Sequence, residues 1–191
     1  MTTLVDVLKN LFGRKPTVAA VAKPAMSRTG KGMVAGSVAL TALATGVISE
    51  FEGRHLRAYQ DIVNVWTICE GETKGVKPGD VATHAECDSM LAKNIVLYEA
   101  LLDRCLTAPV PGKMKVALIS WTLNVGGGAV CKGGPGGGPA TVVNRANAGN
   151  LTGACDALLA WNRAGGNVVR GLTNRREKER QLCLQGVQEG V

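Results

Sequence analysis

The most apolar part of the chain is a run of 17 residues, "GMVAGSVALTALATGVI" at positions 32–48, which contains no charged side chain. After it, "HLRAYQD" (55–61) and "VNVWTIC" (63–69) alternate between apolar and polar positions, as half-buried strands do. The residues between them, from Asp61 to Asn64, are typical of a turn. We therefore expect a long apolar segment followed by a small β-hairpin.

Helical patterns fill most of the remaining chain. Thr83 and Glu86 have the spacing of a capping box, in which each side chain bonds backbone N–H groups of the first helical turn. The helix that follows would turn these residues inward: Leu91, Ile95, Tyr98, Leu101 and Leu102. Further helices are expected at 113–124 and around 139–148, 151–162 and 173–186. A small sheet beside a mostly helical body is an α+β domain.

A glycine-rich stretch, "VGGGAVCKGGPGGGP" at 125–139, follows the second of these helices. It lacks the Lys-Ser/Thr ending of a phosphate-binding loop and does not follow a strand. We expect a flexible loop near a cleft.

Positive charge is concentrated ahead of the apolar run. The formal net charge is +7, of which residues 1–31 carry +5, so the body of the protein carries only about +2. Nucleic-acid binding would need a basic face on the folded domain, and this distribution argues against it. Basic residues before an apolar run are the layout of a signal peptide or membrane anchor, although 17 residues is at the lower limit of a bilayer span. The alternative is that 32–48 is a buried core helix.

Six cysteines are spread along the body of the chain without a CxxC pair, which argues against a zinc site. An even number of scattered cysteines indicates disulfides in an oxidising compartment, and the alternative is that some are buried thiols. They are Cys69, Cys87, Cys105, Cys131, Cys155 and Cys183. Cys155 and Cys183 lie on two expected C-terminal helices that would be antiparallel neighbours, so this pair is expected first. Cys69 with Cys87 and Cys105 with Cys131 would complete the set.

Glu52, Asp61 and Thr67 are the candidates for chemistry. Glu52 falls where the apolar helix would end, Asp61 at the turn of the hairpin and Thr67 in its second strand. A helix end folded against a hairpin brings such residues around one cleft. One protonated and one ionised carboxyl group there suit glycoside hydrolysis, with the hydroxyl helping to hold a water. These residue types also occur at such spacings by chance as solvated surface groups.

The stretch "EFEGRHLRAYQDIVNVWTICEGET" (50–73) resembles the catalytic stretch of the phage-type lysozymes, whose motif is E-G-x-x-L-x-x-Y-x-D-x-x-G-x-x-T. The matching residues are Glu52, Gly53, Leu56, Tyr59, Asp61 and Thr67. The likeness continues through "THAECDSMLAKNI", "SWTLNVGGG" and "GACDALLAWNRAGGNVVRGLTNRREKERQLCL", and so covers roughly residues 50–186.

The resemblance implies a lysozyme-like fold in which Glu52 is the general acid, Asp61 positions or activates water, and Thr67 helps to hold it. It implies hydrolysis of the β-1,4 bond between N-acetylmuramic acid and N-acetylglucosamine in peptidoglycan, without a metal or cofactor. Tyr59, Trp121 and Asn124 are the expected substrate-binding residues. Trp121, among apolar neighbours, fits a core position better, and Asn124 fits a helix cap equally well.

A subgroup of these lysozymes carries an N-terminal signal-arrest-release segment, weakly hydrophobic and rich in Gly and Ala. This segment tethers an inactive enzyme to the host inner membrane before release into the periplasm. Residues 32–48 resemble it, so we expect a basic arm at 1–31, this segment at 32–48 and a lysozyme-like domain at 49–191 that acts as a monomer. The chain departs from the subgroup in the 31 residues that precede the segment.

The chain also departs from the family motif close to the candidate site. Asn64 replaces a glycine but tolerates the left-handed turn. Glu70 and Glu72 stand in the segment after the Thr-Ile pair, where the family commonly has G-x-G-H. Carboxylates near the cleft would favour the protonated form of Glu52 or would disturb a local salt bridge.

Three arginines near the C-terminus fit a solvated helix face, where they would alternate with Glu177 and Glu179. They are Arg175, Arg176 and Arg180. Binding of an anionic wall polymer is the alternative for this face. For the whole chain, the two alternatives to an enzyme are a non-catalytic peptidoglycan-binding domain and a membrane-disrupting lysis protein.

Overall fold

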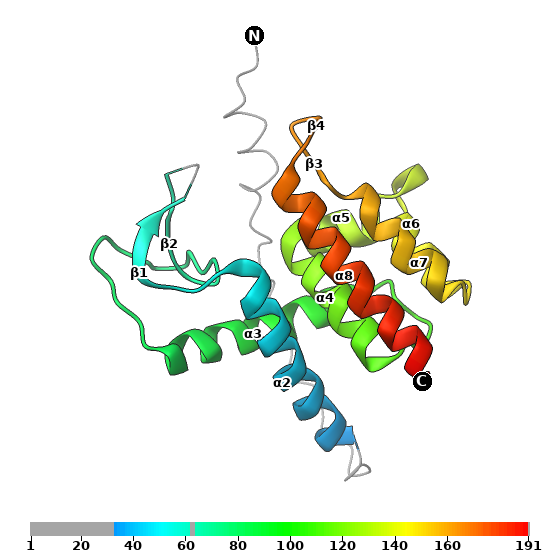
Figure 1. Ribbon diagram of the computed structural model, residues 1–191, viewed down its shortest axis with the longest axis horizontal. Coiled ribbons are helices and arrows are strands. Elements are labelled where there is room, and N and C mark those ends of the chain that lie inside the picture. Colours follow the sequence, from blue (N-terminus) through cyan, green and yellow to red (C-terminus); the bar gives the residue numbers. More distant parts are fainter. Residues whose placement is uncertain (1–32, 62–63, 191) are drawn as a thin grey trace.

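The computed structural model describes residues 33–61 and 64–190 of the chain, and the basic arm expected at 1–31 lies outside this part. The helices are α2 (Met33–Glu52), α3 (His84–Leu102), α4 (Gly112–Val125), α5 (Gly127–Lys132), α6 (Thr141–Asn147), α7 (Leu151–Ala157) and α8 (Arg170–Glu189), with 3₁₀ turns at Pro135–Gly137 and Leu158–Ala160. The strands are β1 (His55–Gln60), β2 (Trp66–Cys69), β3 (Arg163–Ala164) and β4 (Asn167–Val168). In Figure 1 the β1–β2 hairpin projects to one side, α4 to α8 pack together on the other, and α2 and α3 lie between them. The predicted α+β architecture is confirmed.

The hairpin forms where the alternating pattern predicted it. β1 pairs antiparallel with β2, with Tyr59 opposite Thr67 and Gln60 opposite Trp66. Asn64 adopts a φ of 60°, so this residue takes the left-handed conformation for which the family uses glycine.

The capping box at the start of α3 is also confirmed. The Thr83 hydroxyl oxygen accepts the Glu86 backbone N–H at 3.2 Å, and the Glu86 carboxylate accepts the Thr83 backbone N–H at 2.7 Å. Behind this cap, Leu91, Ile95 and Leu102 are buried, as the periodicity predicted. α3 is therefore fixed at its start by its own side chains and along its length by the core.

The prediction of a flexible loop for the glycine-rich stretch is wrong, since residues 127–132 form α5 and residues 135–137 a 3₁₀ turn. A side-chain carbon at Gly127 would lie 2.9 Å from Cβ of Leu101, so glycine here permits close packing against α3. Cys131 of α5 is bonded to Cys105, which fixes the short helix to the segment after α3.

The short hairpin β3–β4 was not predicted. It occupies residues 163–168, and its turn is Gly165-Gly166, with φ of 56° and 83°. Two adjacent glycines with positive φ are a favoured two-residue hairpin connection. The last helix begins at Arg170, three residues before its predicted start.

The C-terminal half of the apolar segment belongs to the main hydrophobic core. Ala44 and Ile48 of α2 are fully buried in the same cluster as Leu118 and Trp121 of α4. For this half of the segment the core-helix interpretation is therefore confirmed. Within the described residues, no helix has the length and apolar character needed to cross a membrane.

Three disulfides join elements that are distant in sequence, and their pairing is the predicted one. They are Cys69–Cys87, Cys105–Cys131 and Cys155–Cys183. The first lies in a small second core between the hairpin and α3, beside Ile68 and Ala82. The third joins α7 to α8. The first disulfide thus cross-links the hairpin lobe, which is the β1–β2 hairpin with the start of α3, and the other two cross-link the helical part.

Candidate active site

The end of α2 is the first component of the candidate site. Glu52 is the last residue of this helix, as predicted, and its side chain lies outside the described part of the chain. Gly53 follows with a φ of 72°, a conformation that residues with a side chain rarely adopt. The chain then enters β1, so the sharp change of direction occurs immediately after Glu52.

Asp61 and Thr67 meet at the turn of the hairpin, where both bond to Val65. The Val65 backbone N–H donates to Oδ1 of Asp61 at 2.9 Å, and the Thr67 hydroxyl donates to the Val65 carbonyl at 3.0 Å. Thr67 is only 3% exposed. The turn therefore fixes the direction of both side chains, and the structure brings two of the three predicted catalytic residues together.

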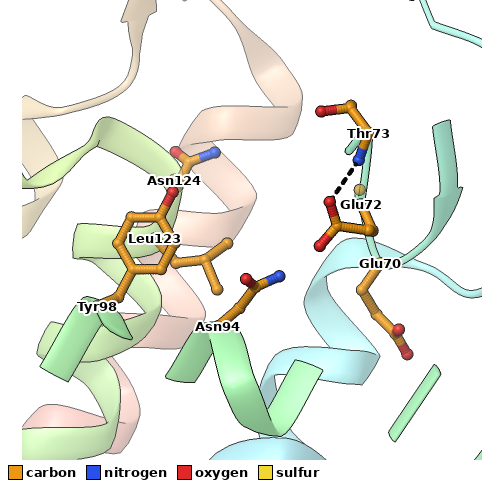
Figure 2. Close-up of a pocket in the computed structure, with 8 residues that line it drawn as sticks. Glu70, Glu72, Thr73, Asn94, Tyr98, Leu123 and Asn124 are labelled. Atoms are coloured by element: carbon orange, nitrogen blue, oxygen red, sulfur yellow. Dashed lines mark hydrogen bonds between the residues drawn. The ribbon is translucent and has the colours of Figure 1, made fainter. Parts of the chain in front are cut away.

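A pocket of about 260 Å³ lies between the segment after β2 and the helices α3 and α4. Its lining residues are Glu70, Gly71, Glu72, Thr73, Asn94, Tyr98, Leu123 and Asn124. Figure 2 shows Asn94 and Tyr98 on α3 and Asn124 on α4 facing Glu72 and Thr73 across the space. Carboxamide, hydroxyl and carboxylate groups dominate this lining, which suits a strongly hydrogen-bonding ligand.

The two glutamates that depart from the family motif have different roles. Glu70 is almost completely buried and forms an ion pair with Arg54. Glu72 accepts the backbone N–H groups of Thr73 and Lys74 at 3.0 and 2.7 Å, and so closes the turn at the edge of the pocket. The structure thus shows an ion pair built on Glu70, which is neither of the two effects expected for these residues.

Asn124 is the one predicted substrate-binding residue that lines the pocket. Nη2 of Arg176 donates to its Oδ1 at 2.7 Å. Because the carbonyl oxygen is held by this bond, the NH₂ group points away from Arg176, toward the pocket in Figure 2. A buried arginine on α8 therefore orients a donor at the pocket wall.

The predicted solvated face of α8 is wrong for three of its residues. Arg175, Arg176 and Glu179 are buried against α4. Oε1 of Glu179 accepts from the Ser120 hydroxyl at 2.7 Å and from Nε of Arg175 at 3.0 Å, and Oε2 lies 3.0 Å from Nε of Arg176. Burial raises the pKa of Glu179, although both guanidinium groups and the Ser120 hydroxyl oppose this change. Arg180 is more exposed and pairs with Asp156 of α7.

The other two predicted substrate-binding residues lie outside the pocket. Trp121 is fully buried and packs edge-on against Trp161, with 5.2 Å between ring centroids. Its ring has no surface to offer a sugar, so the core interpretation holds. Tyr59 is half-buried on β1, opposite Thr67, with its ring 4.4 Å from that of His55.

Cys69, Glu70 and Cys87 bring three potential metal-ligating atoms within 4.8 Å of one another. Both thiols are bonded in the Cys69–Cys87 disulfide. The cluster therefore offers no thiolate to a metal and has a structural explanation.

Sequence reasoning missed Asn94 as a pocket residue and placed Tyr98 only in the core. The available signal was that Asn94 and Tyr98, four residues apart, lie on the same helix face as the buried Leu91 and Ile95. A polar group on an otherwise apolar face indicates a position where that face meets a cleft.

Comparison with known proteins places this geometry in a family. The phage lysozyme family model matches residues 49–179. A SAR-endolysin of Enterobacteria phage P21 is 38% identical over 138 residues, which cover 72% of this chain and 79% of that protein. A SAR-endolysin of Pseudomonas phage phiKMV is 36% identical over 151 residues, or 77% of this chain and 89% of that protein.

Solved structures agree with these relatives. An endolysin from Escherichia coli O157:H7 phage FAHEc1 matches with a TM-score of 0.65 at 30% identity, over 74% of this chain and 90% of that one. A mutant of P22 lysozyme matches with a TM-score of 0.66 at 28% identity, over 75% and 96%. With the family motif intact around the hairpin and the fold shared along the domain, the chain belongs to the phage lysozyme family.

Proposed function

We propose that this protein is an endolysin that hydrolyses the β-1,4 bond between N-acetylmuramic acid and N-acetylglucosamine in bacterial peptidoglycan during host cell lysis. The observation that carries the proposal is the turn of the β1–β2 hairpin. There Asp61 and Thr67 are both held by Val65, in the family motif that begins with Glu52 at the end of α2.

In the proposed reaction, Glu52 donates its proton to the glycosidic oxygen as the bond to the sugar carbon breaks. Asp61, in its ionised form, accepts a proton from the attacking water. Because the Thr67 hydroxyl hydrogen is used by the Val65 carbonyl, its oxygen meets the water as an acceptor. Asp61 and Thr67 thus each accept a hydrogen bond from the water and turn its lone pair toward the sugar; only the proton bonded to Asp61 is transferred as the water attacks, and the other stays on the new hydroxyl group.

We propose the polar pocket as the part of the cleft that holds the glycan. Sugars present hydroxyl and N-acetyl groups, which pair with the carboxamides of Asn94 and Asn124 and the hydroxyl of Tyr98. Tyr59 is proposed as a further contact from the hairpin side. None of these roles requires a metal or cofactor.

The proposed route to the substrate is tethering to the host inner membrane through the segment 32–48, followed by release into the periplasm. The relatives named SAR-endolysins support this proposal. Three disulfides also suit an oxidising compartment such as the periplasm. The core position of Ala44 and Ile48 supports a final state in which this half of the segment has joined the domain.

The proposal is tested by incubating the full chain with isolated peptidoglycan, reducing the products with borohydride and identifying the new sugar ends. We expect reduced N-acetylmuramic acid. Reduced N-acetylglucosamine would assign a different bond, and the absence of new ends would favour a non-catalytic wall-binding protein. Release of dye from phospholipid vesicles without any cleavage of peptidoglycan would favour a membrane-disrupting protein.

A further inference from the structure

We propose that Arg54 is a positioning residue, which acts with Glu70 and Asp88 to fix the end of α2, and with it Glu52, against the hairpin lobe. This inference rests on the proposed function, in which Glu52 is the general acid. It adds Arg54 and Asp88, which lie outside the pocket lining but decide where the acid stands.

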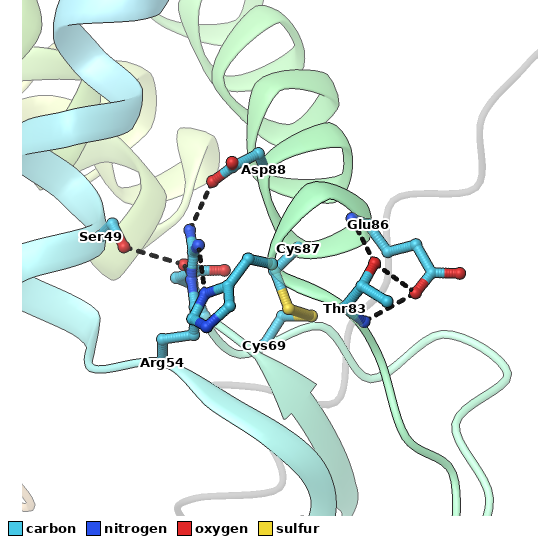
Figure 3. Close-up of a disulfide and its surroundings, with 9 residues drawn as sticks. Ser49, Arg54, Cys69, Thr83, Glu86, Cys87 and Asp88 are labelled. Carbon is cyan, nitrogen blue, oxygen red and sulfur yellow. Dashed lines mark hydrogen bonds and ion pairs between the residues drawn. A yellow bond between two sulfur atoms is a disulfide. The ribbon is translucent and has the colours of Figure 1, made fainter.

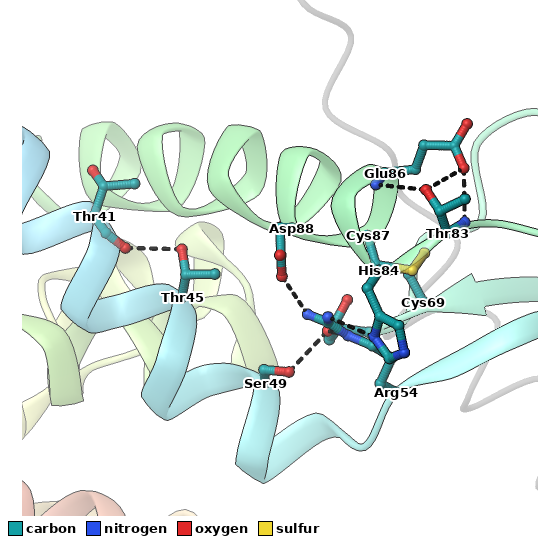
Figure 4. Close-up of polar contacts among 11 residues, drawn as sticks. Thr41, Thr45, Ser49, Arg54, Cys69, Thr83, His84, Glu86, Cys87 and Asp88 are labelled. Atoms are coloured by element: carbon teal, nitrogen blue, oxygen red, sulfur yellow. Dashed lines mark hydrogen bonds and ion pairs between the residues drawn. A yellow bond between two sulfur atoms is a disulfide. The ribbon is translucent and has the colours of Figure 1, made fainter.

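Two groups on either side of Glu52 in the sequence meet on one buried carboxylate. Nε of Arg54 donates to Oε1 of Glu70 at 2.6 Å, and the Ser49 hydroxyl donates to the same oxygen at 3.0 Å (Figure 4). Ser49 lies three residues before Glu52, and Arg54 two residues after it. The Glu70 side chain is only 3% exposed. The residues on both sides of the proposed acid, Ser49 and Arg54, are thus bound to the same oxygen of Glu70.

Ser49 differs in this respect from the hydroxyl residue one turn earlier in α2. The Thr45 hydroxyl donates to the carbonyl of Thr41 within its own helix, at 2.8 Å (Figure 4). Such a bond satisfies the hydroxyl locally and holds nothing else. The Ser49 hydroxyl instead joins the last turn of α2 to the residue that follows β2.

The two carboxylates to which Arg54 donates lie next to a disulfide. Nη2 of Arg54 donates to Oδ1 of Asp88 at 2.6 Å. Glu70 directly follows Cys69 and Asp88 directly follows Cys87, and these two cysteines form a disulfide (Figure 3). The disulfide therefore holds the two residues that carry the carboxylates close together, and the planar guanidinium group spans them.

The backbone between Glu52 and Arg54 explains why such a device is needed. Gly53 has a φ of 72°, and apart from its two chain neighbours no described residue has an atom within 4 Å of where its Cβ would stand. Glycine reaches this conformation readily, but it has no side chain that contacts neighbours and holds the chain there. The contacts of Ser49 and Arg54 supply the constraint from both sides.

A purely stabilising role is the alternative, and the exposure of Asp88 argues against it. The Asp88 side chain is 54% exposed, and ion pairs with such exposed partners add little to the free energy of unfolding. Small displacements of a catalytic group, by contrast, reduce rates strongly. Asp88→Asn leaves the buried Arg54–Glu70 ion pair in place. This substitution is thus expected to change the reaction rate far more than stability.

The experiment compares the full chain with Arg54→Gln, Asp88→Asn and the double variant, on soluble glycan fragments of peptidoglycan. Arg54→Gln is expected to lower kcat by about tenfold to a hundredfold with KM within about twofold, since substrate binding does not use Arg54. Asp88→Asn should lower kcat in the wild-type background but not in the Arg54→Gln background. Glu189→Gln, which removes the exposed ion pair with Lys113, is the matched control and should change neither constant.

The pH profile separates positioning from general loss of structure. Within the described part of the chain, the charged and titratable groups in contact with Arg54 are Glu70, Asp88 and His84, whose Nδ1 lies 3.3 Å from Nη1 of Arg54. Arg54→Gln leaves two carboxylates unbalanced beside the last turn of α2, the turn that ends at Glu52, so loss of activity at alkaline pH should move to higher pH. Asp88→Asn leaves Arg54 less neutralised and should move this loss to lower pH.

An unchanged kcat in Arg54→Gln, or equal rate losses from Asp88→Asn in both backgrounds, would overturn the inference. The inference would also be overturned if the pH profiles of Arg54→Gln and Asp88→Asn moved in the same direction. A loss of kcat that simply follows the fall in melting temperature from variant to variant would overturn it too. Glu52→Gln distinguishes this result from failure of the proposed function. If Glu52→Gln is inactive while the Arg54 variants are normal, only the positioning role is wrong. If Glu52→Gln is fully active, the acid itself is misassigned.

Discussion

The burial of Glu179 could not be predicted from the residues next to it in the sequence. Arg175, Arg176 and Glu179 have the pattern of a solvated helix face, yet all three are buried. The reason lies further along α8, where a side-chain carbon at Gly186 would be 2.5 Å from the Met114 backbone nitrogen. Glycine at this point lets α8 pack closely against α4, and the close approach covers the charged residues as well.

The Ser120 hydroxyl is expected to contribute measurably to stability through its bond to Glu179. Ser120→Ala removes a buried donor to a carboxylate, and we expect the free energy of unfolding to fall by about 1.5–3 kcal/mol near neutral pH. Urea unfolding of the full chain measures this change. Thr122→Val is the matched control on α4, because the buried Thr122 hydroxyl bonds only the neutral Leu118 carbonyl.

The same pair of variants has a defined pH dependence. The pKa of Glu179 is above its ordinary value of 4.5 in the folded protein, so its contribution to stability falls as the pH rises from about 4.5 through the folded value. Ser120→Ala raises the pKa of Glu179 in the folded protein further, so this fall continues to higher pH and becomes larger in total. Its cost should therefore be largest near neutral pH and shrink in acid, whereas the cost of Thr122→Val should stay constant. Equal pH dependence of the two would contradict the assignment.

Asn124 allows the pocket to be tested without disturbing the core. Asn124→Asp keeps the oxygen that Arg176 requires but replaces the NH₂ donor at the pocket wall. Loss of one hydrogen bond to the substrate corresponds to an increase in KM of about two- to tenfold, with little change in melting temperature. Steady-state kinetics on soluble glycan fragments measure the KM, and an unchanged KM would remove Asn124 from the binding site.

At the scale of elements, the sequence allowed two interpretations of α2, as an export segment and as a core helix. Its lack of charge and its small residues match an export segment, and the same residues fit a core helix. The structure places Ala44 and Ile48 in the core, whereas Leu43, on another face, is 40% exposed. Periodicity left these interpretations open because the low polarity of the segment extends around the whole helix.

Two substitutions on this helix separate core packing from apolar character alone. Ile48→Ala should lower the free energy of unfolding by about 2–5 kcal/mol, because it opens a cavity between α2, α3 and α4. Leu43→Ala removes a similar volume at a more exposed position and should cost about 0.5 kcal/mol or less. Equal losses in thermal or urea unfolding would show that α2 does not pack as described.

For the whole molecule, features set by local chemistry were predictable and features set by distant contacts were not. The hairpin and the Thr83 capping box followed from spacing and turn residues. The Cys155–Cys183 pair is an exception, because it joins distant residues but followed from the expected antiparallel packing of two C-terminal helices. The α5 helix was not predictable, because its two glycines suggest a loop and the packing against Leu101 that explains Gly127 is visible only in the folded protein.

The same distinction applies to the candidate site, in which residues close in sequence were predictable and residues from distant segments were not. Glu52, Asp61 and Thr67 lie within sixteen residues of one another and form a recognisable motif. The pocket combines residues from three distant segments, and the Arg54 contacts depend on a disulfide that brings Glu70 and Asp88 together. Of the residues that line the pocket, only Asn124 was predicted to bind the substrate, and the full combination was visible only in the folded protein.

The most direct test of the account is the release of soluble sugar from isolated peptidoglycan by the full chain and by Glu52→Gln, at equal concentrations of folded protein. Removal of the proton that a general acid supplies is expected to lower the rate by about a hundredfold or more, with the melting temperature nearly unchanged. A Glu52→Gln protein that is folded and digests peptidoglycan as fast as the parent would contradict the account.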